Sequence, residues 1–197
     1  APPMPKPLAP VPMRQSATSL NVLRKLWRRF RRNRNGSAAV EFAFVAPLFF
    51  VLLFAIIETA LVFFAAQVLE TGTQDSARLM LTHQAQDAGM TQAQFKLDLC
   101  NRVTLLLSCD GVYVDVKSYA EGAAVNITDP IDGAGNFVNN FSYQTTPAGS
   151  AATVVVRAFY QWPMFVTGLG YNIANINRTT SNSKRLLAAT AAFRVEP

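Results

Sequence analysis

The feature that most constrains this chain is an apolar run that begins at Phe42 and continues, with one interruption, to Ala66. Residues 42–57 contain no charged or strongly polar side chain, and the run resumes after Glu58 and Thr59. A bilayer core of about 30 Å needs roughly 20 helical residues, so the run is long enough to cross it. A buried helix of a soluble domain is the alternative, but such helices are rarely apolar on every face for this length. The run therefore predicts a transmembrane helix over residues 37–66.

Two residues inside the run need an account. Pro47 removes a backbone hydrogen bond and predicts a kink, which membrane helices tolerate where neighbours satisfy the freed carbonyl. By helical rise Glu58 falls near the far end of the span, where a charge costs less than at the centre. We therefore expect Glu58 near the outer membrane interface.

The positive charge of the chain is concentrated before this run. Residues 1–36 carry nine Lys or Arg and no acid, whereas the remaining residues carry nine basic and twelve acidic side chains. The net charge of +6 therefore describes the N-terminal segment, and a nucleic-acid-binding head loses support, because the binding surface has to belong to the domain that docks. Residues 1–12 are rich in proline and poor in core-forming side chains, which predicts that residues 1–36 are a disordered basic leader.

The same basic block predicts the orientation in the membrane. Lys and Arg are retained on the cytoplasmic side, so residues 1–36 are expected in the cytoplasm and residues 67–197 in the periplasm, beyond the inner membrane. A cleaved secretory signal peptide within residues 20–66 is the alternative. Its apolar region would be about 7–15 residues followed by a small-x-small site. The run here is longer, and residues 65–67, AAQ, form only a weak site of that kind.

The remaining residues predict an α+β head. The helix is expected to continue through residues 67–86 and to end near Gly89, with a loose apolar stripe; Thr91 caps a second helix with a buried face at every third or fourth residue. Alternation predicts a strand at 112–116, and residues 153–162 and 185–195 are predicted as two more strands. Loops over 121–150 and 167–183 separate the three strands. The result is a long N-terminal helix, a second helix and a small antiparallel sheet. The stripe is Leu69, Ala77, Met80 and Leu81, and the buried face is Phe95, Leu99, Val103 and Leu106.

The order of basic run, glycine, carboxylate and apolar helix resembles a type IV prepilin processing site. The resemblance implies that a membrane peptidase cuts after Gly36, so that Ser37 becomes the N-terminus and Glu41 the acid at the fifth position of the mature helix. Ser37 and Glu41 share a helix face, and a carboxylate in the first turn is favoured by the helix dipole. In pilin filaments this acid is thought to meet the N-terminal amine of a neighbouring subunit. A simple interfacial glutamate that marks the start of the span is the alternative.

A narrower resemblance covers about thirty residues. Residues 36–49, GSAAVEFAFVAPLF, and residues 56–58, IIE, look like the opening of TadE-like proteins, the minor pseudopilins of tight-adherence (Tad/Flp) pilus systems, and residues 191–197 are similar to the closing strand of that family. Phe42 stands where Flp major pilins usually carry tyrosine, and the length of the chain favours a minor subunit. The resemblance implies an inner-membrane protein that is cleaved by a prepilin peptidase, needed for pilus assembly, and partnered by other Tad pilus subunits and the inner-membrane platform.

The only cysteines are Cys100 and Cys109, and both follow the predicted span. In an oxidising periplasm an even pair at this spacing predicts a disulfide that closes a short loop, and two free buried thiols are the alternative. The spacing does not suit zinc ligands. The single histidine, His83, completes no metal site or catalytic dyad, and we expect it to be a solvated helix residue.

The sequence predicts neither an enzyme nor a cofactor. It has no phosphate-binding glycine loop, no G-x-S-x-G and no paired carboxylates in a recognisable context. Residues 129–136, DPIDGAGN, suggest a calcium loop but are also turn formers and lack the ligand alternation of an EF-hand. Two classes stay open: an assembly subunit of a Tad pilus, and a signal-anchored periplasmic binding domain, with a type II secretion pseudopilus subunit between them. A place in the filament, at its tip or at its base is equally open.

Overall fold

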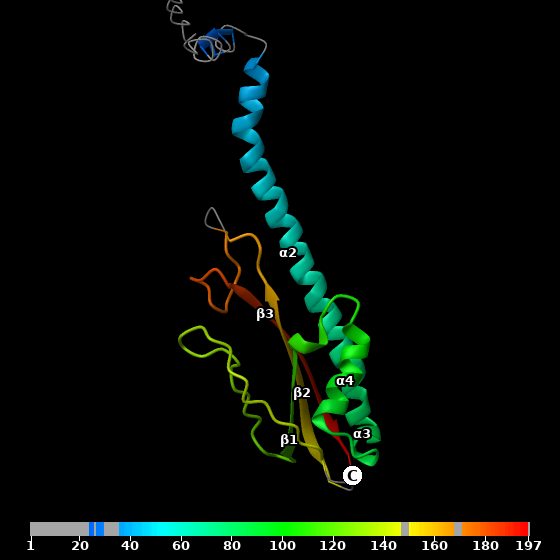
Figure 1. Cartoon of the computed structure of the whole chain (residues 1–197). Helices are drawn as coiled ribbons and strands as arrows, with labels where there is room; N and C mark the ends of the chain where they lie inside the picture. The colour runs from blue at the N-terminus through cyan, green and yellow to red at the C-terminus, as the bar shows by residue number, and fades with distance from the viewer. Residues whose placement is uncertain (1–23, 26, 30–35, 147–149, 168–170, 197) are drawn as a thin grey trace, which may run out of the picture. The chain divides into compact units, whose positions relative to one another are not determined.

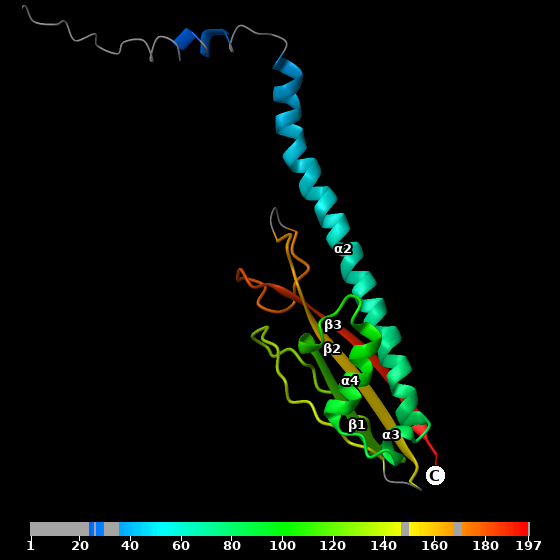
Figure 2. The same ribbon diagram turned by 45° about the vertical axis from the view of Figure 1, so that its right-hand side comes forward.

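The computed structural model describes residues 24, 25, 27–29, 36–146, 150–167 and 171–196 (Figures 1 and 2). The chain divides into two compact units, Ala1–Phe49 and Phe50–Pro197. Most of the predicted leader, residues 1–36, lies outside the described residues. The fold class is confirmed, because the described chain holds a long apolar helix, shorter helices and a three-stranded antiparallel sheet.

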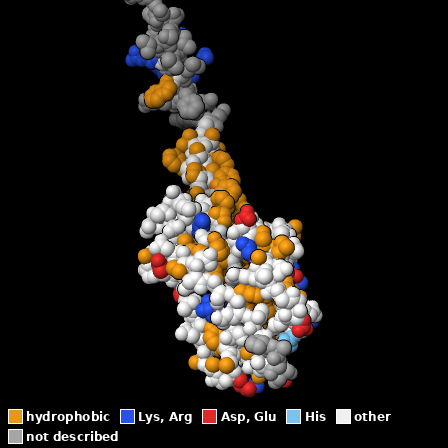
Figure 3. Space-filling model, turned by 60° about the horizontal axis from the view of Figure 1, so that its bottom comes forward, with side chains coloured by type: hydrophobic (Ala, Val, Ile, Leu, Met, Phe, Trp, Pro, Cys, Tyr) orange, Lys and Arg blue, Asp and Glu red, His pale blue; other side chains and the backbone are white. Residues whose placement is uncertain are grey.

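Helix α2 spans Ser37–Leu81 and contains Pro47. The segment Ala38–Leu81 is long and apolar enough to cross a membrane. Large apolar side chains in its first part are exposed, among them Phe42, Phe44 and Leu48, and Figure 3 shows hydrophobic side chains on the surface of this helix. This long apolar helix, with apolar residues exposed on its surface, fits the predicted single-pass membrane anchor.

From Val62 onwards the same helix packs against the head. Ala65, Leu69, Ala77 and Met80 are buried there, but Leu81 is exposed, so its place in the predicted stripe was wrong. Leu81 is the last residue of α2 and points away from the face that buries Met80.

The predicted helix end near Gly89 was also wrong. Helix α2 ends at Leu81, His83 adopts a left-handed conformation with φ of 62°, and a single turn of helix, α3, follows over Gln84–Asp87. His83 is therefore a half-buried turn residue rather than a solvated helix residue, and its Nε2 lies 3.3 Å from the carbonyl oxygen of Glu196. The reversal lets the chain return along α2.

Helix α4 spans Gln92–Val103, and its predicted cap at Thr91 is confirmed. Thr91 and Gln94 form a reciprocal capping box, in which the Gln94 amide donates to Thr91 Oγ1 at 3.3 Å and the Thr91 amide donates to Gln94 Oε1 at 2.8 Å. The buried face holds Phe95, Leu99 and Val103 as predicted. Leu106 is only partly buried because α4 has already ended, and Leu107 takes the core position instead.

Helices α2 and α4 approach closely at Gly72. A Cβ on Gly72 would lie 2.5 Å from Val103 Cγ1, which is closer than real side chains come. Four residues further along α2, the hydroxyl of Ser76 donates to Asp98 of α4 at 2.8 Å. The glycine thus sets the spacing between the two helices.

The sheet is an antiparallel meander in the order β1, β2, β3. A single 3-10 turn, η2, precedes it over Cys109–Gly111. All three predicted strands are confirmed, and each extends beyond the predicted residues by one residue or more. The strands are β1 Val112–Ala120, β2 Ala152–Pro163 and β3 Lys184–Val195.

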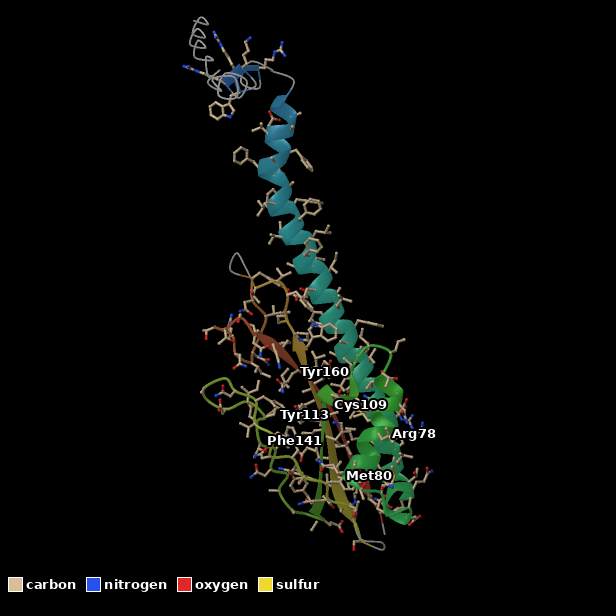
Figure 4. The ribbon with its side chains drawn as sticks, in the orientation of Figure 1. Arg78, Met80, Cys109, Tyr113, Phe141 and Tyr160 are labelled. Atoms are coloured by element: carbon tan, nitrogen blue, oxygen red, sulfur yellow. A yellow bond between two sulfur atoms is a disulfide. The ribbon has the colours of Figure 1, made fainter. Side chains whose placement is uncertain are left out.

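The two faces of the sheet have different covers. One face packs aliphatic side chains such as Val114, Val156 and Leu187 against α2 and α4. The other lies under the connection between β1 and β2, where Tyr113, Phe141 and Phe159 form an aromatic cluster. Figure 4 shows Tyr113 and Phe141 on the loop side of the sheet and Met80 on the helix side. The head therefore has three layers: helices, sheet and loop.

Candidate functional site

The predicted processing residues lie at the start of α2. Gly36 immediately precedes the helix, and a Cβ at this position would meet nothing within 4 Å. Ser37 is the first residue of α2, and Glu41 and Phe42 are exposed about one turn later. Cleavage after Gly36 and a pairing role for Glu41 stay predictions.

Glu58 is buried, with only 4% of its surface exposed. Its carboxylate accepts hydrogen bonds from the backbone amide of Phe165 and, at 3.1 Å to Oε2, from that of Val166. These two amides belong to the chain that follows β2. Hydrogen bonds from oriented amides offset the cost of removing a carboxylate from water. The sequence predicted only the position of Glu58 along the helix, not this partner.

A second contact attaches the same connection to the same helical turn. The hydroxyl of Tyr171 hydrogen-bonds with the hydroxyl of Thr59 and also lies 3.4 Å from the carbonyl oxygen of Ala55. Thr59 itself donates to the Ala55 carbonyl at 2.7 Å. We call this arrangement the helix–loop junction: Ala55, Glu58 and Thr59 on α2 with Phe165, Val166 and Tyr171 on the connection between β2 and β3.

The disulfide between Cys100 and Cys109 is present, with 5.3 Å between the two Cα atoms. It joins the last turn of α4 to η2, the turn that leads into β1. The predicted pairing is therefore confirmed, and free buried thiols are excluded for this pair. The bridge ties the helix layer to the first strand of the sheet.

A buried ion pair holds the loop layer in place. Arg157 Nη2 lies 2.6 Å from Asp115 Oδ2, and both side chains are almost completely buried. Arg157 also donates to the carbonyl of Thr128 at 2.8 Å, and Asp115 accepts from the amide of Ser142 at 2.9 Å. The sequence interpretation missed this pair. One signal pointed to it: an arginine within the apolar strand VVVRAFY needs a buried partner.

The acidic segment 129–136 is a turn held by its own backbone. Asp132 Oδ1 accepts from the amides of Ala134 and Asn136, at 2.9 and 2.8 Å. Hydrogen bonds from Asn136, chiefly its backbone amide, lower the pKa of Asp132 below its ordinary value. In the described ranges no three metal-ligating side chains come together. The turn interpretation accounts for these residues.

A shallow groove of about 460 Å³ lies between α4, β1 and the loop layer. Its lining includes Gln92, Lys96, Tyr113, Asn139 and Phe141. The Gln92 side chain donates to the Val114 carbonyl at 2.9 Å, so it covers part of the edge of β1. Two of these five side chains are ionisable: the amine of Lys96 and the phenol of Tyr113. The groove thus brings no nucleophile and base together among the residues that line it.

Comparison with known proteins bears on the N-terminal part of the chain. Residues 36–78 match the model of the TadE-like protein family. No curated protein matches the chain, and no solved structure matches it. The matched segment begins at Gly36 and contains Glu41, Pro47, Glu58 and most of α2. Over residues 36–78 the chain is thus similar to the TadE-like family, as its resemblance predicted, and this similarity is consistent with a TadE-like protein of the Tad pilus system.

Proposed function

We propose that this protein is a minor pseudopilin required for the assembly of a Tad/Flp pilus. The observation that carries the proposal is the family match that begins at Gly36, at the junction between the basic segment and the apolar helix. In this proposal residues 1–36 are a cytoplasmic leader, residues 37–66 span the inner membrane, and residues 67–197 are a periplasmic head. A prepilin peptidase, other pilus subunits and the inner-membrane platform are its partners.

The division of labour along the chain supports this role. The exposed apolar side chains of α2 require lipid or the helices of other subunits around them. The head has its own aliphatic core beneath α2 and α4 and does not need those partners to bury it. Such a protein acts by helix packing and by surface contacts, and the proposal assigns no catalytic group.

Cleavage after Gly36 is the most direct test. A Cβ at this position meets no neighbour within 4 Å, so we expect Gly36→Val to leave the folded head intact. The β-branched side chain should instead prevent the backbone from lying close to a membrane peptidase. We expect mass spectrometry to find Ser37 as the N-terminus of the wild-type protein and to find the leader retained in Gly36→Val. Gly36→Ala is the matched control with a smaller side chain.

Three other outcomes have distinct meanings. A wild-type N-terminus after Ala66 would identify a secretory signal peptide and overturn the pilin assignment. An uncleaved wild-type protein would favour a signal-anchored binding domain. Normal maturation of Gly36→Val would contradict the proposed peptidase specificity.

Glu41 is proposed to act in assembly rather than in folding. It lies in the second turn of α2 and is exposed, so its removal takes nothing from the core of the head. In a membrane its charge is costly unless it is compensated, and the new amine of Ser37 on a neighbouring subunit would compensate it. We expect Glu41→Ala to insert normally but to abolish pili, whereas Glu41→Asp should retain some. Normal pili with Glu41→Ala would make Glu41 only a marker of the membrane boundary.

The disulfide provides a test of orientation. Such a bond persists in an oxidising compartment, which the periplasm is and the cytoplasm is not. We expect thiol labelling of denatured protein from cells to find Cys100 and Cys109 blocked until a reductant is added. Free thiols, with a head that protease cannot reach once the outer membrane has been opened, would reverse the proposed topology.

A further inference from the structure

The connection after β2 presents a large apolar side chain to the surroundings. Phe165 exposes 79% of its surface, although its own backbone amide is bound by the buried Glu58. The residue before it, Met164, packs into the core. The backbone of Phe165 is thus fixed to α2, and its ring is not covered by the described part of the head.

This place is beside apolar helix surface. Phe54 and Leu61, four residues before and three residues after Glu58, share its helix face and are exposed, at 55% and 44%. Beyond Glu58, Phe63 exposes 71% of its surface and Phe64 is exposed as well. The exposed apolar surface of α2 therefore continues past the turn to which Phe165 is attached.

The length of the helix also places the turn to which Phe165 is bound within the apolar layer. A bilayer core of about 30 Å accommodates roughly 20 helical residues, so a span that begins at Phe42 reaches Leu61. The turn that carries Glu58 and Thr59 then lies inside the apolar layer, close to its outer boundary. Phe165 is hydrogen-bonded directly to that turn and has to lie at nearly the same depth.

Several polar groups of the connection between β2 and β3 have hydrogen-bond partners, which favours its placement at the membrane depth of Glu58. Irregular backbone is tolerated in an apolar layer only where its amides and carbonyls have partners. The amides of Phe165 and Val166 donate to Glu58, and the Tyr171 hydroxyl is bonded to α2. Glu58 in turn receives two donors in place of water. The junction thus supplies partners for these two amides and this hydroxyl, which lipid could not.

We propose that the helix–loop junction is a lipid-binding site, at which the head dips into the outer leaflet and Phe165 inserts among the acyl chains. The proposal rests on the membrane insertion of α2 but not on a role in pilus assembly. Its occupant is phospholipid, because the site is continuous with the surface that the membrane has to cover. Aromatic side chains favour this boundary region.

The test uses the full chain in vesicles of phosphatidylcholine and phosphatidylglycerol. Because Cys100 and Cys109 are paired, one introduced cysteine is the only free thiol and can carry an environment-sensitive nitrobenzoxadiazole label. The probe position is Phe165→Cys, which removes an exposed side chain and keeps the backbone amide that binds Glu58. Ile56→Cys, on the exposed helix surface, is the lipid reference, and Ile127→Cys, exposed in the loop layer, is the water reference.

We expect nitroxide groups on the lipid acyl chains to quench the label at position 165 nearly as strongly as at position 56, and severalfold more than at position 127. Water-like emission at 165 with lipid-like emission at 56 would overturn the site and leave the membrane anchor standing. Water-like emission at both positions would overturn the anchor as well. A blue-shifted label at 165 that lipid nitroxides do not quench would show a protein cover, such as a second copy, and would also overturn the proposal.

A second variant tests whether Glu58 holds the site. Adding Glu58→Ala to Phe165→Cys removes the acceptor of the two amides and should move the label outwards, which lowers its quenching. Adding Glu70→Ala instead changes an acid of the same helix that lies outside the junction, and should leave the quenching unchanged. Equal quenching in all three proteins would overturn the assigned role of Glu58.

Discussion

Two parts of helix α2 have the same backbone conformation but opposite requirements. The apolar part, residues 38–57, carries large hydrophobic side chains on every face and leaves most of them exposed. The head part, residues 62–81, buries one face only, and that face includes Gly72, Thr73 and Ser76. Small and polar residues are useful there because a second helix approaches closely and offers hydrogen-bond partners.

The difference shows that the surroundings, and not helix propensity, decide the composition of each part. Lipid acyl chains are apolar and have no fixed packing surface, so a helix surrounded by them can carry large side chains on all faces. Where the neighbour is α4 and a sheet, each position has to match a particular contact. Glu58 lies at the change from one part to the other, which is where the first buried charge of the helix is found.

The largest expected effect separates the two parts directly. Leu69→Ala removes a fully buried side chain of the head part and should destabilise the head by about 2–5 kcal/mol, whereas Phe54→Ala in the apolar part should leave the head unchanged. Urea unfolding of the full chain in detergent micelles, followed by fluorescence, measures both. Equal losses for the two variants would break the comparison.

Removal of the disulfide should act on the head alone. Replacing both Cys100 and Cys109 by serine releases the link between α4 and η2 and should cost about 2–3 kcal/mol in the chain-entropy model. The same micellar unfolding experiment measures this loss, and reduced wild-type protein should behave like the double variant. Resistance to alkaline extraction from membranes reports on the apolar part and should not change. Easier extraction would mean that the two parts are not independent.

At the boundary between the parts, Glu58→Ala should have a smaller and local effect. It leaves the amides of Phe165 and Val166 without their acceptor, which costs about 1–3 kcal/mol when those amides remain buried. Hydrogen exchange at these two amides should accelerate, while exchange in β2 should not. Glu58→Gln keeps a carbonyl acceptor and should lose less. Uniform acceleration over the whole head would instead make Glu58 part of the global core.

The smallest effect concerns the helix that covers the head part. Thr91→Ala removes the N-cap of α4 and should lower the stability of the head by about 1 kcal/mol, and Thr91→Ser, which keeps the hydroxyl, should restore most of it. The urea midpoint of the micellar protein is sufficient to detect the loss. A loss as large as that of Leu69→Ala would show that α4 folds less independently than its capping box suggests.

Local patterns explain why much of the fold was predictable. The alternation of Val112, Val114 and Val116 requires only that one side of a strand is buried, and the cap at Thr91 depends on residues three positions apart. The apolar length of α2 is equally local. These features were found from the sequence because their causes lie within a few residues of them.

The features that were missed have partners far along the chain. Glu58 and the amide of Phe165 are separated by 107 positions, and Asp115 and Arg157 by 42. Asp115 lies on the face of β1 opposite Val114 and Val116, and the connection between β1 and β2 covers that face. The break at His83 had no local signal either, because neither glycine nor proline marks it. Contacts between residues far apart in sequence determine the conformation and burial of such residues. A pattern within a short stretch of sequence does not contain this information.

The Asp115–Arg157 pair also bears on how the sheet aligns during folding. The two residues are direct neighbours across β1 and β2 in the native register, which closes a long connection. A slip of one residue would turn Arg157 towards the aliphatic face, where its charge would have no counterion. Thr128 and Ser142 can add their hydrogen bonds only after the strands have paired correctly. The ion pair therefore favours the native register of β1 and β2, because only this register places Arg157 opposite Asp115.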